Sequence, residues 1–215
     1  MTLSLTLVLI GSFLTLDTPK PASSLPDPQA ELRAIKDEAT RAIGKAIKAV
    51  MAAKSETETS KIKEEAISTL AKLHRRAIEL AARHARDPIA LKALEWVVNY
   101  HGPGDQTPEV ASALVLLRRD HSRNDGLAGL CENLDRLDSP ESEAFLRSVA
   151  AENPVPAVQA AALYNLALLL HHRADSLGND RPREATRYSH EAEPMAASRA
   201  QSLSSIVYRG CRPFT

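Results

Sequence analysis

The segment DPIALKALEWVVNY, Asp87–Tyr100, opens with a polar residue and a proline and continues as an apolar run. Comparable starts recur four more times before Leu170, at Thr107-Pro108, Asn124-Asp125, Ser139-Pro140 and Val155-Pro156. Asn124-Asp125 lacks the proline, and Val155 lacks a capping side chain, so four of the five starts have a cap. Proline is tolerated at the first helical position, and Asp, Thr, Asn or Ser before it can accept from the unpaired amides of the first turn. We therefore expect helices to begin at residues 88, 108, 125, 140 and 156.

The spacing of these starts predicts an architecture. They lie 15 to 20 residues apart, so two successive steps make a helix pair of 31 to 37 residues. That is the range of known helical repeats. No strand-like alternation stands out, so the chain is expected to be all-α, with antiparallel helical hairpins stacked like a TPR or HEAT solenoid.

Two longer helices are predicted before this stretch. Apolar residues at three-to-four spacing mark an amphipathic helix from about Gln29 to Lys54 and a second from about Lys61 to Arg86. The polar run Ser55–Ser60 is the expected turn, which would make the pair a helical hairpin. The charged faces of both helices are interpreted as solvated surface rather than as a binding patch.

The apolar pattern also predicts the core and the ends of later helices. Gly102-Pro103-Gly104 and Asn153-Pro154 should each end a helix, and residues 157–170, apolar nearly all round, should lie between neighbours. Six or seven antiparallel helices are expected. Their predicted core residues are Leu70, Leu94, Trp96, Val97, Leu116, Leu130, Leu146, Leu163 and Leu166.

Composition excludes some classes of partner. The 27 Lys and Arg balance 27 Asp and Glu over 215 residues, so no overall field attracts nucleic acid or anionic lipid. Aromatic residues are only 4% of the chain, which argues against a platform for stacking bases. A protein partner is expected, and no nucleic acid.

The two ends of the chain differ from the middle. Residues 1–24 are predicted to be a secretory signal, because Met1–Leu16 carries an apolar run too short to span a bilayer comfortably. The alternative is an N-terminal segment that is buried or tethers the chain to a membrane. Export to the periplasm or another extracytoplasmic space is therefore expected, with no stable membrane span once the signal is removed.

The remaining boundaries follow from composition. Residues 25–28 form a linker, 29–175 the helical domain and 176–215 a poorly ordered basic tail with an alternative, weak final helix near Arg183–Glu193.

No catalytic, cofactor or metal site is predicted. Cys131 shares its helical face with leucines, so a buried, inert thiol is favoured, whereas Cys211 lies among arginines that would favour its thiolate. A disulfide between them is left open. His171 and His172 point about 100° apart on a helix, so they cannot chelate as a pair on one face. With Arg173, they are interpreted as complementing a helix C-terminus.

Several short motifs carry a family resemblance. Arg119-Asp120-His121-Ser122, Gly129-Leu130-Cys131, Asp138-Ser139-Pro140 and Pro156–Ala160 resemble the helical N-terminal region of exported bacterial redoxin proteins, over about Gln29–Ala174. In that family the region precedes a thioredoxin-fold domain of the thiol-disulfide interchange or peroxiredoxin type. The family's Trp-Cys-x-x-Cys or peroxidatic cysteine segment has no counterpart here.

Two functions follow from the sequence. The favoured one is a non-catalytic helical interaction or scaffold module of an exported protein. The alternative is a truncated redoxin that lacks its catalytic domain, and a truncated or frame-shifted reading of a longer gene would explain the changed character of the tail.

Overall fold

The computed structural model describes residues 27–100, 107–134, 137–177, 184 and 186–195. Every regular element in these ranges is a helix, which confirms the all-α prediction. The elements are α1 (Pro28–Ala52), α2 (Glu56–Arg83), α3 (Pro88–Asn99), α4 (Pro108–His121), the 3-10 turn η1 (Asp125–Leu127), α5 (Ala128–Cys131), α6 (Pro140–Glu152) and α7 (Pro156–Leu177). Residues 186–195 are also helical, which agrees with the weak final helix considered above.

All five predicted starts are confirmed. Four have the expected side-chain cap: Asp87 accepts from the Ile89 amide at 2.8 Å, and Thr107, Asn124 and Ser139 cap the next three in the same way. Before the fifth start, the Oδ1 of Asn153 accepts from the amide of Val155, the residue that precedes α7, at 3.0 Å. Asn153 is also the residue after α6, so the predicted helix end at Asn153-Pro154 is confirmed.

The first hairpin is confirmed, but its predicted turn is wrong. Most of Ser55–Ser60 is helical, because Ser55 is the N-cap of α2 and accepts from the Glu58 amide at 3.2 Å. Glu58 reaches back to the Lys54 amide at 3.0 Å. This reciprocal pairing closely resembles a capping box. α2 therefore begins at Glu56, earlier in the chain than the predicted Lys61.

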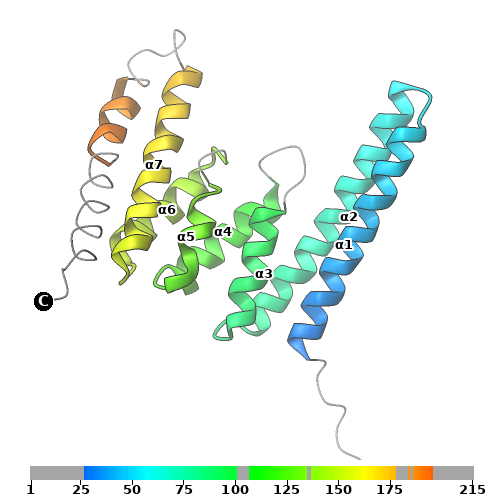
Figure 1. Cartoon of the computed structure of the whole chain (residues 1–215), viewed down its shortest axis with the longest axis horizontal. Helices are drawn as coiled ribbons and strands as arrows, with labels where there is room; N and C mark the ends of the chain where they lie inside the picture. The colour runs from blue at the N-terminus through cyan, green and yellow to red at the C-terminus, as the bar shows by residue number, and fades with distance from the viewer. Residues whose placement is uncertain (1–26, 101–106, 135–136, 178–183, 185, 196–215) are drawn as a thin grey trace, which may run out of the picture.

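Consecutive helices pack against each other in a row, as Figure 1 shows: α1 on α2, α2 on α3, α3 on α4, α4 on α6, and α6 on α7. Their buried side chains form one hydrophobic cluster. Seven of the nine predicted core residues are buried, Trp96 among them. Leu116 and Leu163 are only half-buried, because each lies at the edge of the face that its helix turns to the core. The solenoid-like character of the row stays a prediction.

The last long helix has the surroundings expected from its composition. α7 buries residues on most of its circumference, including Ala161, Leu166 and Leu169. It packs on α5, α6 and η1. The predicted helix between neighbours is therefore confirmed. The predicted stop at Gly102-Pro103-Gly104 and residue Cys211 lie outside the described residues.

Candidate functional site

The first hairpin is much longer than the helix that covers it. At about 1.5 Å per residue, the 28 residues of α2 extend about 42 Å, whereas the 12 residues of α3 extend about 18 Å. The last buried residue of α1 is Ala39, and the first of α2 is Leu70. Residues 40–69, which we name the arm, therefore project beyond the core, as the upper right of Figure 1 shows.

The arm carries an apolar groove between its two helices. The groove encloses about 600 Å³ and is lined by Ile43, Ala46, Ile47, Val50 and Met51 of α1 and by Lys63, Ala66, Ile67 and Leu70 of α2. We name this surface the arm groove. Leu70 belongs both to the groove and to the core, so the groove continues the hydrophobic face on which the base of the molecule is built.

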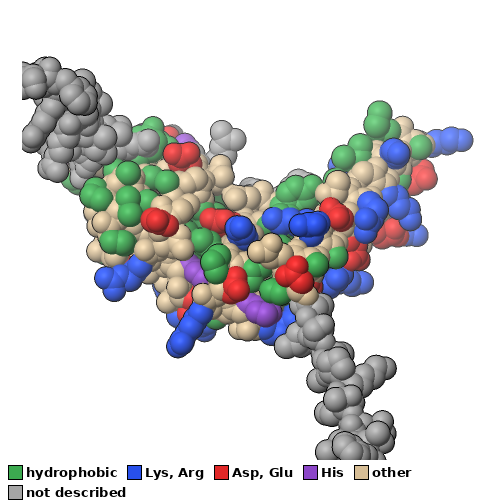
Figure 2. Space-filling model, turned by 60° about the horizontal axis from the view of Figure 1, so that its bottom comes forward, with side chains coloured by type: hydrophobic (Ala, Val, Ile, Leu, Met, Phe, Trp, Pro, Cys, Tyr) green, Lys and Arg blue, Asp and Glu red, His purple; other side chains and the backbone are tan. Residues whose placement is uncertain are grey.

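The exposure of the arm groove is unusual within this chain. Ile47, Met51 and Ile67 are exposed by 54%, 83% and 42%. They are three of the five large hydrophobic side chains that are exposed among the described residues. Figure 2 shows hydrophobic side chains along the inner edge of the projecting arm, facing the hollow beside the body. Clustered exposure of this kind marks interaction surfaces more often than scattered single residues do.

Charge is distributed unevenly around the arm groove. Lys63 is the one charged residue among those that line it. On the α1 side of the arm, residues 40–54 include no Asp or Glu but four exposed cations, Arg41, Lys45 and Lys48 of α1 and Lys54 in the turn after it. The α2 side of the arm, by contrast, carries both signs, with Glu56, Glu58, Glu64 and Glu65 beside Lys61 and Lys63.

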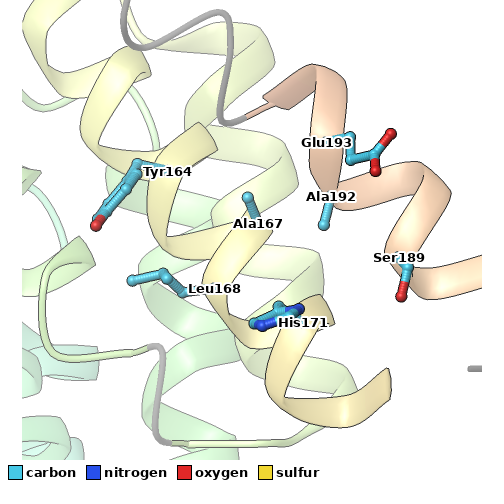
Figure 3. A pocket seen from close by; sticks show the side chains of 7 residues that line it. All are labelled: Tyr164, Ala167, Leu168, His171, Ser189, Ala192 and Glu193. Carbon is cyan, nitrogen blue, oxygen red and sulfur yellow. The ribbon is translucent and has the colours of Figure 1, made fainter. Parts of the chain in front are cut away.

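A second, smaller hollow of about 430 Å³ lies between α7 and residues 186–195. Tyr164, Ala167, Leu168 and His171 line one side, and Ser189, Ala192 and Glu193 the other. Figure 3 shows Ala167 and Ala192 facing each other, whereas the side chains of Tyr164 and Glu193 point away from one another. His171 instead lies 3.5 Å from Asp175 on its own helix. The polar groups do not converge on one point, so this hollow does not resemble a catalytic site.

An ionic cluster holds the last helical residues in place. Arg173 of α7 donates to Asp138 and to Glu143 at 2.6 Å each, and its guanidinium lies 5.1 Å from the ring centre of Tyr188. Arg147 of α6 bridges Glu143 and Glu191. Burial raises the pKa of Glu143, but hydrogen bonds from the two arginines outweigh it and hold that pKa below its usual value. These groups are paired with each other, so the cluster is structural.

This cluster changes the interpretation of Arg173. α7 continues to Leu177, and its last turn contains no basic residue. Arg173 therefore serves the carboxylates of Asp138 and Glu143 rather than the end of its helix. His171 and His172 are exposed and also lie before that last turn.

The described cysteine has the properties expected of an inert thiol. The Cys131 side chain is fully buried. Burial, with a smaller contribution from Glu132, raises the pKa of its thiol to about 12. The thiolate is the nucleophile and the metal ligand, so a thiol with this pKa is unreactive near neutral pH.

Two further findings concern the described residues only. No group of three or more His, Cys, Asp or Glu among them is placed to hold a metal ion. None of the helices in these ranges combines the length and the apolar character needed to cross a membrane.

The chain was compared with known proteins in three ways. No family model matches it, and neither a curated protein nor a solved structure does. What the fold and the surfaces above define is an all-α protein with a projecting helical arm.

Proposed function

We propose that this chain is a non-catalytic helical interaction module of an exported protein, and that the arm groove is its binding surface. The observation that carries the proposal is the exposure of Ile47, Met51 and Ile67 around one groove, on a part of the hairpin that takes no part in the core. Solvent exposure of such a face is unfavourable, at about 25 cal/mol for each Å² of apolar surface, so burying it under a partner is favourable.

The chemistry of the described residues supports the same proposal. Cys131 is buried and its thiol pKa is raised, and the polar groups beside α7 do not converge. Export is supported by the apolar run within Met1–Leu16. A relation to exported redoxin proteins is also part of the proposal, and it rests on the short sequence motifs that resemble that family.

Site-specific photo-crosslinking tests the binding surface. A photoreactive amino acid is placed at Ile47, in the groove, or at Lys45, which is two positions earlier and lies about 200° away around α1. The full chain is then irradiated in the cells that produce it. We expect a discrete crosslinked protein from position 47 and none from position 45. Equal labelling from both positions, or no product from position 47, would contradict the proposal.

A further inference from the structure

We propose that the arm groove takes a single amphipathic helix whose apolar face is flanked by acidic residues. This inference rests on the proposed function and names the class of partner for that surface. It comes from three features of the arm: the space that α3 leaves open, the shape of the groove and the sign of its charges.

The open space has the dimensions of one helix. α2 is longer than α3 by 16 residues, or about 24 Å, and α3 lies on the base of the same hairpin. A helix of about 16 residues, or four turns, would therefore cover the arm as α3 covers the base. Docking of an amphipathic helix into an apolar groove is a common mode of peptide recognition.

The shape of the arm groove favours inserted side chains over a flat contact. Ala46 and Ala66 are its small members, one on each helix, while Ile43, Ile47, Val50 and Ile67 are large. Apolar side chains at positions i, i+3, i+4 and i+7 of a bound helix could pack above the alanines and between the larger residues. Leucine and similar side chains fit this spacing.

The charges around the arm groove favour acidic residues on both sides of the apolar face of the bound helix. The charged residues of α1 within the arm are all cations, and Lys63 lines the groove from α2, beside the acidic Glu64. Lys48 follows the groove residue Ile47 by one position, about 100° further around α1, and it forms no ion pair among the described residues. Acidic flanks would give Lys48 and Lys63 partners. A second copy of the arm docked with α1 against α1 would instead set the same cations against each other.

Two synthetic peptides of 16 residues test this inference on the full chain. Both carry leucine at the apolar positions, and the remaining positions are glutamate-rich in one and lysine-rich in the other. Fluorescence anisotropy measures their binding. We expect the glutamate peptide to bind at least ~10-fold more tightly than the lysine peptide, because like charges across an interface are strongly unfavourable. In about 0.5 M salt the difference should fall below ~3-fold through screening.

Charge reversal on the arm makes the test specific. In Lys48→Glu/Lys63→Glu the preference should shift toward the lysine peptide by at least ~10-fold. Lys45→Glu, exposed on the opposite face of α1, is the control and should change either affinity by less than ~2-fold. Ile47→Gln/Met51→Gln should weaken both peptides by at least ~10-fold, since it removes exposed apolar groups that the core does not use. Circular dichroism of each variant verifies that the helices are intact.

The outcomes separate this inference from the proposed function. Equal binding of the two peptides, no binding of either, or no change of preference on charge reversal would overturn the acidic helix as the partner. A crosslinked product at position 47 with the mass of two chains would do the same and would indicate a second copy. In each of these cases crosslinking at position 47 would still support the arm groove as a binding surface.

Discussion

The side-chain amide of Asn153 donates to the backbone carbonyl of Asn124 at 2.7 Å, and so ties the turn after α6 to the turn after α4. The same amide donates to the Ser122 carbonyl at 2.9 Å. The side chain is almost fully buried, at 1% exposure, and its Oδ1 accepts from Val155. One residue thus satisfies polar backbone groups in two turns that are about 30 positions apart.

Replacing Asn153 with Ala should destabilise the protein by about 2 to 4 kcal/mol, because buried backbone groups would lose their partners. Chemical unfolding followed by circular dichroism measures the change. Asn133→Ala is the matched control. The Asn133 amide also donates two hydrogen bonds, but at an exposed site, so this variant should lose less than about 0.5 kcal/mol. Similar losses in the two variants would show that the Asn153 bridge contributes little.

Two leucines of α7 should differ in their effect on stability. Leu166 is 1% exposed, and Leu166→Ala should destabilise the fold by about 2 to 5 kcal/mol. Leu163, expected from the sequence to be equally important, is only half-buried, so Leu163→Ala should cost about half as much or less. Thermal or chemical unfolding of the two variants gives the comparison, and equal losses would contradict the burial described above.

Stability should fall in acid through the Glu143 cluster. The pKa of Glu143 is lower in the folded state than in the unfolded chain. The contribution of its ionised carboxylate to the free energy of unfolding is therefore fully present above the unfolded pKa of about 4.3. The contribution is lost as the pH falls through the lower, folded pKa. Glu143→Gln should therefore be about 1 to 2 kcal/mol less stable at pH 7, and its stability should change less between pH 5 and 3. Unfolding curves over this range, with the exposed Glu79→Gln as a control, test the sign.

The thiol of Cys131 should not react in the folded protein. With a pKa near 12, less than about one thiol in a thousand is ionised at pH 8. A maleimide reagent should label Cys131 only after denaturation, and the chain should show no turnover in insulin-reduction or peroxide-consumption assays with dithiothreitol. Turnover well above background that disappears in Cys211→Ser would contradict the non-catalytic interpretation.

The arm should gain stability from one small substitution. Gly44 lies within α1, where glycine is less favourable than alanine by about 0.5 to 1 kcal/mol, and an added Cβ there would meet no atom within 4 Å. Gly44→Ala should therefore raise the free energy of unfolding by up to that amount. No gain would indicate that the arm unfolds independently of the core. The stability added to the arm would then not contribute to the free energy measured for unfolding of the core.

The helix starts could be predicted from sequence because each one depends on residues that are adjacent in the chain. Asp87 and Pro88, or Ser139 and Pro140, define a cap without reference to the rest of the fold. The start of α2 also depends on residues that are close in the chain, so the sequence carries a signal for it. Ser55 followed by Glu58 has the spacing of a capping box, but the polar character of Ser55–Ser60 resembles a turn equally well.

The arm groove could not be predicted, because its residues look like core residues. Ile43 and Ile47 continue the same three-to-four spacing as Leu32, Ile35 and Ala39, which are buried. The difference arises from the length of α3, which covers only the base of the hairpin. The partners of Arg173 depend on the fold in the same way, because Asp138 and Glu143 lie 30 or more positions away.

Because the arm projects beyond the core, its length can change without affecting the packing of the base. No side chain between residues 40 and 69 is buried, so the base would keep its packing if both helices were lengthened or shortened together. Seven residues added to each helix, close to two turns, would move the tip outward by about 10 Å and return the apolar seam to nearly the same orientation. The arm is in this sense a spacer of adjustable length, on which selection or a designer could act without redesigning the molecule that carries it.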